Sequence, residues 1–168
     1  DELILMEWHN TEVQNLKNNL HGKNIAIHHR DGFEGLVAVS PPKLKRGLVL
    51  IDPSYELTDD YQSVVEAVTS AYQRWPTATY AIWYPLIAQR DNKDTNFSGV
   101  KGKAELSQNM LEVLSKQSFG NLLNVQLLIN KKEQGQGMYG SGMLVVNAPW
   151  KFEQTISQSL QQILPFMA

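Results

Sequence analysis

The chain has 168 residues, of which 42% are hydrophobic and 19% charged, a composition typical of one globular domain with a real core. A net charge of −2 excludes an overall basic field that would attract nucleic acid, so any such contact has to use local clusters of Lys and Arg. The absence of cysteine excludes disulfides and thiolate metal sites, and no apolar run approaches the roughly 18 residues of a membrane-spanning helix.

Short apolar runs alternate with segments of helical periodicity along most of the chain. Val13, Leu16 and Leu20 are spaced by three and four residues, which is typical of one helix face. The segment from Tyr61 to Tyr72 repeats that spacing. We predict strands at residues 3–6, 25–28, 48–51, 79–84, 122–130 and 143–146. We predict helices at residues 12–20, 58–74, 104–116 and 152–164, and a short helical or irregular segment at 33–39.

The order of these elements predicts an α/β fold. The first four strands alternate with crossover segments, which favours a parallel sheet. The last two are separated only by the polar, Gly-rich residues 131–139, too few for a crossover helix, so we expect them to pair antiparallel. The predicted sheet is therefore mostly parallel with one antiparallel strand near the edge. Residues 1–168 form a single domain in this interpretation, with the first strand beginning almost at residue 1.

The most informative stretch is the apolar run 48–51, which leads into Asp52-Pro53-Ser54-Tyr55. A short continuous apolar run between Gly47 and Pro53 is typical of a strand buried on both faces. Ligands of open parallel sheets bind outside the carboxyl ends of the strands, so Asp52 is expected at the functional edge. A turn whose Asp caps the next segment is an equally good interpretation of this tetrapeptide taken alone.

Asp52-Pro53-Ser54-Tyr55 resembles the Asp-Pro-Pro-Tyr motif of methyltransferases that use S-adenosylmethionine to methylate exocyclic nitrogens of bases. The other matching segments are Glu7-Trp8-His9, Arg30-Asp31-Gly32-Phe33, Arg46 to Glu56, Tyr80 to Pro85, Ser141-Gly142-Met143 and Asn147 to Lys151. Together they resemble the bacterial family that methylates N6 of one adenine in 23S ribosomal RNA.

The resemblance implies a Rossmann-like sheet with helices on both faces, S-adenosylmethionine as cofactor, and protein-free or partly assembled ribosomal RNA as substrate in the cytoplasm. Residues 89–103 match poorly. The family's upstream strand and Gly-rich loop, which receive the methionine end of the cofactor, have no counterpart in this sequence. We therefore expect the chain to be the C-terminal part of a longer catalytic domain, and this part alone need not be active.

The resemblance also implies roles for single residues. Glu7 and Asp31 take the positions of the acids that bond the ribose and face the adenine of the cofactor. Without the resemblance, Glu7 could be a surface acid and Asp31 a turn former before Gly32. The residues expected to bind the cofactor are Glu7, His9, Asp31, Gly32 and Asp52. Those expected to act in catalysis are Asp52, Pro53 and Tyr55, with Tyr55 stacked on the target base. Those expected to contact RNA are Ser54, Tyr55, Lys45, Arg46, Arg90, Lys93, Lys101 and Lys103.

Three other patterns are interpreted as structural. Residues 135–140 spell a Gly-rich cofactor pattern, but a predicted strand follows them where a helix would be needed. The adjacent His28 and His29 point to opposite faces of a strand, and the four histidines share no ligand spacing, so no metal is expected. Residues 147–150 are interpreted as a turn, with Trp150 as packing.

Two alternatives to the ribosomal RNA enzyme remain open. The tetrapeptide is shared with DNA adenine-N6 methyltransferases. A domain that keeps the sheet but has lost cofactor binding could act as a non-catalytic RNA-binding scaffold. The sequence does not determine the oligomeric state.

Overall fold

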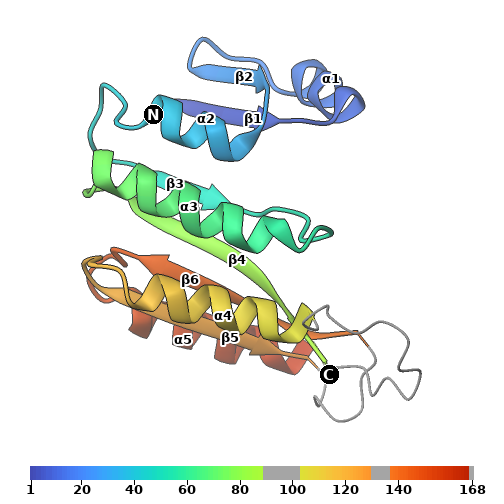
Figure 1. The fold of residues 1–168 in the computed structure, drawn as a ribbon, viewed down its shortest axis with the longest axis vertical. Helices are drawn as coiled ribbons and strands as arrows, with labels where there is room; N and C mark the ends of the chain where they lie inside the picture. Colours follow the sequence, from blue (N-terminus) through green and yellow to red (C-terminus); the bar gives the residue numbers. More distant parts are fainter. Residues whose placement is uncertain (89–102, 130–136, 167–168) are drawn as a thin grey trace.

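The computed structural model describes residues 1–88, 103–129 and 137–166. In these residues strands and helices follow one another in the order that the sequence predicts (Figure 1). The strands are β1 (Leu3–Glu7), β2 (Ile25–His29), β3 (Leu48–Ile51), β4 (Thr79–Ile87), β5 (Leu122–Leu128) and β6 (Met138–Val146). The helices are α1 (Asn10–Asn19), α2 (Gly32–Val39), α3 (Asp59–Arg74), α4 (Lys103–Ser115) and α5 (Phe152–Ile163), followed by the 3₁₀ helix η1 (Leu164–Phe166).

The strands form two sheets where the sequence predicts one. β1 and β2 pair parallel in a two-stranded sheet, and the other strands form a sheet of order β3-β4-β6-β5. β3 and β4 are parallel, whereas β6 runs antiparallel between β4 and β5, so one antiparallel strand lies next to the edge as expected. In Figure 1, β1, β2 and β3 point the same way, with α2, α3 and α4 in front of the sheets and α5 behind. Among the described residues, no ladder joins β1 to β3.

β4 is longer than predicted. The sequence predicts that Pro85 ends the strand, yet β4 continues to Ile87. β3 pairs with β4 only as far as Ile82, so β4 has lost its partner on that side before Pro85 is reached. Proline is tolerated in a strand at such an edge, because no ladder partner there needs its missing N–H.

β6 is also longer than predicted, because glycines that resemble a loop belong to the ladder. Gly140 and Gly142 pair with residues of both β4 and β5. The ring of Tyr84 packs so close to Gly142 that a Cβ there would collide with it. A glycine inside a strand often marks such a close approach, and only the tertiary packing reveals it.

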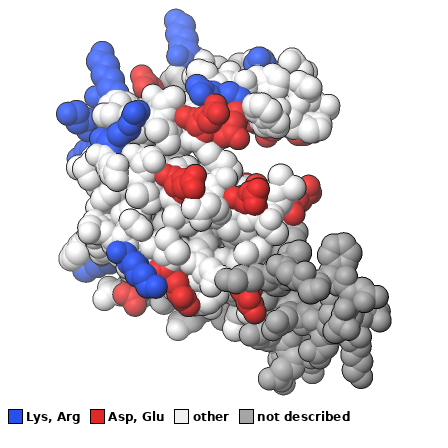
Figure 2. Space-filling model, in the orientation of Figure 1, with Lys and Arg blue, Asp and Glu red and all other residues white. Residues whose placement is uncertain are grey.

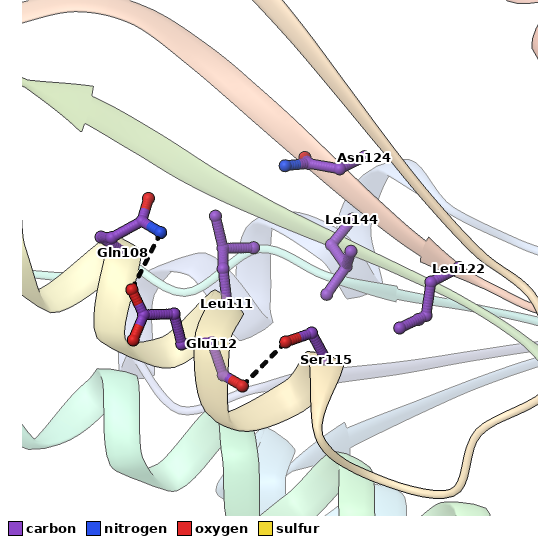
Figure 3. A pocket seen from close by; sticks show the side chains of 7 residues that line it. All are labelled: Gln108, Leu111, Glu112, Ser115, Leu122, Asn124 and Leu144. Atoms are coloured by element: carbon purple, nitrogen blue, oxygen red, sulfur yellow. Dashed lines mark hydrogen bonds between the residues drawn. The ribbon is translucent and has the colours of Figure 1, made fainter.

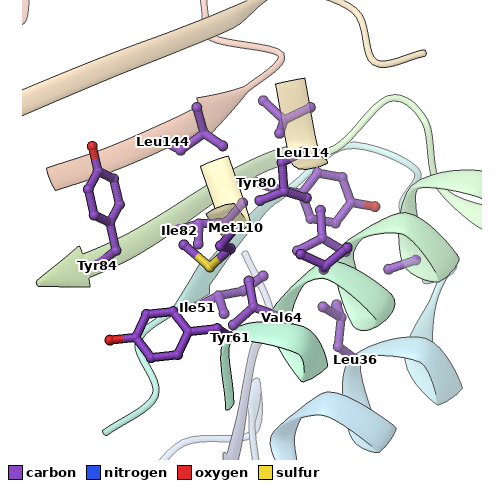
Figure 4. Packing of buried hydrophobic residues seen from close by; sticks show 14 of the residues in the cluster. Leu36, Ile51, Tyr61, Val64, Tyr80, Ile82, Tyr84, Met110, Leu114 and Leu144 are labelled. Carbon is purple, nitrogen blue, oxygen red and sulfur yellow. The ribbon is translucent and has the colours of Figure 1, made fainter. Parts of the chain in front are cut away.

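The core lies between the larger sheet and the helices α3 and α4 (Figure 4). Val64, on the apolar face of α3, is fully buried. The buried tyrosines of β4 keep their hydroxyls hydrogen-bonded, as buried polar groups must. Tyr80 donates to the main-chain oxygen of Trp75 at 2.9 Å, and Tyr84 donates to a side-chain oxygen of β5 at 2.6 Å.

β3, which the sequence predicts to be buried on both faces, is buried on one face only. Ile51 is 7% exposed and belongs to the core, but Leu48 and Leu50 are 68% and 65% exposed. On β1, Leu3 and Ile4 are 42% and 39% exposed, so this strand is also only partly covered. The helix behind the larger sheet, α5, lies by β5 and does not reach β3 (Figure 1).

The segment after β6 forms the predicted turn, but Trp150 does not pack. Asn147 has a left-handed φ of 55° and ends the strand. Trp150 is 85% exposed, so its prediction as a packing residue is wrong for the described part of the chain. None of the described helices combines the length and the apolar character that a membrane crossing requires.

Candidate active site

Glu7, Asp31 and Asp52 each follow the carboxyl end of a strand. Glu7 is the last residue of β1, Asp31 comes two residues after β2, and Asp52 directly follows β3. Because these strands point the same way, the three acids lie along one edge of the molecule (Figure 1). Glu7 pairs in register with His29, so Glu7 and Asp31 stand at neighbouring strand ends, whereas Asp52 belongs to the second sheet.

The turn after β1 orients the carboxylate of Glu7. The main-chain N–H of His9 donates to Glu7 Oε1 at 2.6 Å, while the His9 side chain is exposed. The same turn is held by Arg30, whose N–H donates to the main-chain oxygen of Glu7 at 3.1 Å, and by His29, whose Nε2 lies 2.9 Å from the oxygen of Trp8. The result is an oriented hydrogen-bond acceptor at the edge, suited to the hydroxyls of a ribose.

Asp31 is the N-cap of α2. Its Oδ1 accepts hydrogen bonds from the N–H groups of Phe33 at 2.7 Å and Glu34 at 2.9 Å, which satisfies two of the first amides of the helix. Asp31 thus has the structural role of a turn former before Gly32. This role does not prevent a ligand from binding beside it. A Cβ built on Gly32, the first residue of α2, would meet no atom within 4 Å. The position beside the cap is therefore open at Gly32.

The four residues of the turn after β3 differ in how exposed they are. Asp52 and Ser54 are exposed, Pro53 is half-buried and Tyr55 is buried. The proline ring holds φ near −65°, which limits the direction of the carbonyl. Tyr55 has a φ of 52°, in the left-handed region. A residue other than glycine adopts it at a cost of about 1 kcal/mol or more. The sharp turn leaves the Asp52 carboxylate at the surface and sends the tyrosine ring inward.

Tyr55 points into the core, where no base can stack on it in this conformation. Its side chain is 2% exposed, its hydroxyl donates to the main-chain oxygen of Trp83 at 2.7 Å, and its ring centroid lies 4.5 Å from that of Tyr61. Burial, with smaller effects from Tyr61 and Asp52, raises the pKa of the Tyr55 hydroxyl above its ordinary value of 10. The hydroxyl therefore stays protonated and donates, and the ring anchors the turn.

Trp83 and Met110 hold this anchor, and the sequence does not single them out. The Trp83 carbonyl accepts the tyrosine hydroxyl, and the Met110 sulfur lies 3.8 Å from it. A main-chain acceptor carries no residue signal, and Met110 has the spacing of an ordinary core residue. Only the pairing of β3 with β4 and the packing of α4 bring them to the turn.

The basic residues expected at the site are not gathered there. Lys45 and Arg46 precede β3, whereas Asp52 follows it, so the whole strand separates them. At about 3.3 Å per residue, a four-residue strand spans roughly 13 Å. The RNA contact predicted for Lys45 and Arg46 would therefore lie at a distance from Asp52. Arg90, Lys93 and Lys101 lie outside the described residues, and Lys103 is the first residue of α4.

The described surface has two hollows, and neither is lined by a residue of the turn after β3. One, of about 270 Å³, lies between α4 and the strands β5 and β6 (Figure 3), and it contains none of the candidate residues. It is lined by Gln108, Leu111, Glu112, Ser115, Leu122, Asn124 and Leu144. The other, of about 340 Å³, lies between α2 and α3 and includes Asp31 alone of the candidates. Among the described residues, no three His, Asp or Glu side chains are arranged to hold a metal ion.

Comparison with known proteins gives one consistent result. A family model described as "Ribosomal RNA large subunit methyltransferase D, RlmJ" matches residues 1–168. The chain is 36% identical over 168 residues to ribosomal RNA large subunit methyltransferase J of Haemophilus influenzae, with 99% of this chain and 53% of that protein covered. It is 33% identical to the protein of the same name from Escherichia coli, with the same coverage of 99% and 53%.

The comparison with solved structures supports the fold. A crystal structure from Legionella pneumophila superposes with a TM-score of 0.79 at 31% sequence identity, covering 97% of this chain and 55% of that one. The chain thus spans about half the length of the relatives it matches, 53% in both curated proteins.

Proposed function

Because this chain belongs to the family of ribosomal RNA large subunit methyltransferase D, RlmJ, we propose that it forms the acceptor half of an S-adenosylmethionine-dependent ribosomal RNA methyltransferase. The reaction proposed is methyl transfer to the exocyclic N6 of an adenine in large-subunit RNA. The single observation that supports it most is the turn of Asp52-Pro53-Ser54-Tyr55 directly after β3, at the same edge as Glu7 and Asp31. Ribosomal RNA as substrate implies a cytoplasmic site of action.

Glu7, Asp31 and Gly32 fit the nucleoside end of S-adenosylmethionine. Glu7 Oε1 is oriented by a main-chain N–H at 2.6 Å, so its carboxylate can accept hydrogen bonds from ribose hydroxyls without reorganising. The open space at Gly32 suits the adenine ring beside the Asp31 cap. When bound, the cofactor supplies a methyl group on a sulfonium. His9 contributes its main chain to this end of the site, with its exposed imidazole nearby.

Asp52 and Pro53 are proposed to activate the adenine amine. An exocyclic amine is a poor nucleophile because its lone pair is delocalised into the ring. The Asp52 carboxylate and the Pro53 carbonyl would accept hydrogen bonds from its two N–H groups, which stabilises the tetrahedral, positively charged nitrogen of the transition state. Orientation of the amine toward the methyl group supplies much of the remaining acceleration. No base of raised pKa is needed, since the methylated amine readily loses its proton afterwards.

Tyr55 is proposed to position this turn, a change from the stacking role that the family motif implies. Its hydroxyl bond to the Trp83 carbonyl ties the turn to β4, so Asp52 and Pro53 are held in one arrangement. Exposed Ser54 lies beside Asp52 and would face the substrate. Because serine keeps the N–H that a second proline lacks, the turn is less restricted here than in the family motif.

We also propose that the two sheets are parts of one mostly parallel sheet, completed by a strand from outside this chain. β1 and β3 point the same way, and each has an unpaired edge among the described residues. The exposed Leu48 and Leu50 of β3 are apolar surface that such an addition would help to cover. The matched relatives are about twice as long as the chain, with 53% of their length covered, so they contain further polypeptide from which such a strand could come.

The test compares cofactor binding and methyl transfer by this chain and by a polypeptide of the full family length. Calorimetric titration with S-adenosylmethionine should detect binding by the longer protein and weak or no binding by this chain. In the longer protein, Asp52→Ala should abolish tritium transfer to large-subunit RNA while the melting temperature is kept, because Asp52 is exposed. Retained transfer by Asp52→Ala would remove Asp52 from its role. Absence of binding by both polypeptides would favour the scaffold alternative.

A further inference from the structure

The connections at the amino edge of the larger sheet carry basic residues only. We call this surface the basic edge and define it as residues 40–47, 75–78, 116–121 and 147–151, which join helices to strands at that edge. Its charged residues are Lys43, Lys45, Arg46, Lys116 and Lys151, all of them exposed, and it contains no Asp or Glu. At the opposite edge, the described connection 52–60 contains four acids and no Lys or Arg, while residues 89–102 and 130–136, which carry both signs of charge in the sequence, lie outside the described part.

The described connections at the two edges therefore differ in the sign of their charge. The chain has a net charge of −2, so a random surface would mix both signs. In Figure 2, several Lys and Arg residues of the described part gather toward the side on which β3 and β4 begin, and most of its Asp and Glu residues lie nearer the middle. The only ion pair among the described residues joins Arg30 and Glu34, so none of the cations of the basic edge is neutralised by a described acid.

Hydrogen bonds fix the main chain under the first three cations. The carbonyl oxygen of Lys45 accepts from Trp75 Nε1 at 2.9 Å and from Thr77 Oγ1 at 2.6 Å. The carbonyl oxygen of Gly47 accepts from the N–H of Thr79 at 3.0 Å. The loop 40–47 is therefore held to the start of β4, so the main chain that carries its basic side chains has a fixed position.

Asn147 links the connections 116–121 and 147–151 to the connection before β4. Its Nδ2 donates to the oxygens of Pro76 at 2.8 Å and Ala78 at 2.7 Å, and its N–H donates to the oxygen of Asn121 at 2.9 Å. Asn121 Nδ2 in turn donates to the oxygen of Ala148 at 3.1 Å. All four connections thus form one hydrogen-bonded unit rather than independent loops.

An exposed aromatic side chain lies within this unit. Trp150 is 85% exposed, and the Nζ of Lys151 lies 4.1 Å from the centroid of its ring. An indole with this exposure buries little of its surface within the described chain. Unpaired bases stack on such rings while neighbouring cations contact phosphates, which is the usual combination in proteins that bind single-stranded or looped RNA.

We infer that the basic edge binds the phosphate backbone of RNA, with Trp150 stacking on an unpaired base. The inference rests on the proposed function for the choice of RNA as the polyanion. The edge is at least the length of β3 from Asp52, roughly 13 Å, so it holds a part of the RNA other than the target nucleotide. Phosphate contacts carry no sequence information, so this surface supplies affinity and orientation and leaves selection of the adenine to the acceptor turn.

The experiment measures binding of a fluorescent RNA hairpin, with a stem of about 16 base pairs and an unpaired loop, by anisotropy at several salt concentrations without cofactor. The triple variant Lys43→Ala/Lys45→Ala/Arg46→Ala should bind about tenfold or more weakly near 0.1 M salt, and its salt slope should fall by about one for each phosphate that the variant no longer binds. The charge-preserving variant Lys43→Arg/Lys45→Arg/Arg46→Lys should bind the hairpin as tightly as the unmodified protein. Lys17→Ala, which removes an exposed cation of α1, is the matched control and should have little effect.

Trp150 is tested with the same probe and with a blunt duplex that lacks the loop. Trp150→Ala should bind the hairpin about fivefold or more weakly and leave duplex binding and the salt slope unchanged, because stacking needs an unpaired base. Trp150→Phe keeps a ring and should recover most of the affinity. Equal losses on hairpin and duplex would contradict stacking.

Other outcomes would overturn the inference. The first is an unchanged RNA affinity of a folded triple variant, and the second is an equal loss of RNA affinity in Lys17→Ala. The third is binding of polyglutamate at the same residues as tightly as RNA, which would indicate an acidic protein partner. In the transfer assay with the full-length protein, the triple variant should raise KM for RNA and keep kcat; a loss confined to kcat would refute the inference. RNA binding that depends on the edge in a protein without transferase activity would refute the proposed function and leave this inference standing.

Discussion

Replacing Tyr55 by phenylalanine separates anchoring of the catalytic turn from stacking on a base. The substitution removes only the hydroxyl that donates to the Trp83 carbonyl at 2.7 Å and keeps the ring against Tyr61. Loss of a hydrogen bond in a buried site costs about 1–2 kcal/mol. For a chain of this size each kcal/mol lowers the melting temperature by about 2–4 °C, so a decrease of roughly 2–8 °C is expected.

The same substitution should lower the rate of methyl transfer. Without the bond to β4, the turn that carries Asp52 and Pro53 gains freedom, and a displacement on the order of 1 Å can reduce the rate about 100-fold. We expect kcat to fall at least about tenfold in a full-length protein, with little change in RNA affinity. Thermal unfolding and single-turnover tritium transfer, measured on the same preparation, give both quantities.

Tyr80→Phe is the matched control. Tyr80 is also fully buried, and its hydroxyl donates to a main-chain oxygen at 2.9 Å, but that oxygen belongs to Trp75 at the amino edge of the sheet. This variant should lose similar stability and keep kcat. The reasoning is refuted if Tyr55→Phe melts like the unmodified protein, or if Tyr55 variants lose RNA affinity while kcat at saturating RNA is unchanged, since that is the behaviour of a stacking residue.

Three further predictions concern single residues. Gly142→Ala should lower the free energy of unfolding by about 1–3 kcal/mol in a denaturant titration, because the added Cβ collides with the ring of Tyr84; an unchanged midpoint would contradict this packing. Asp31→Ala should lose about 1 kcal/mol with the cap of α2 and also weaken cofactor binding in calorimetry, whereas Asp31→Asn should recover most of the stability. Burial raises the pKa of Tyr80 from 10.0 to about 12, so its stabilising effect is complete below pH 10 and is lost as the pH rises toward about 12; Tyr80→Phe should flatten this alkaline decline, and an equally steep curve would contradict it.

Much of the fold could be predicted because local patterns determine it. The helix over Asp59–Arg74 is marked by apolar residues at helical spacing, and its buried face is the predicted one. The antiparallel pairing of β5 and β6 followed from the short connector between them. The extensions of β4 past Pro85 and of β6 through its glycines were not predictable, because both depend on which strands lie alongside.

The candidate site divides in the same way. That Asp52 ends a strand is visible in the sequence, because the apolar run stops at it. That Tyr55 turns inward is not, because the outcome depends on the Trp83 carbonyl and on Tyr61, which lie in other elements.

The sequence by itself determined the order of the helices and strands, the acids at three strand ends and the family. Each of these features depends on residues that are close together along the chain. Only the tertiary structure decided that Lys45 and Arg46 share an edge of the larger sheet with Trp150, and that β1 and β3 are not paired with each other in the described part of the chain. These facts concern residues far apart along the chain, and their proximity is set by strand pairing and by the burial of apolar side chains, which no local pattern records.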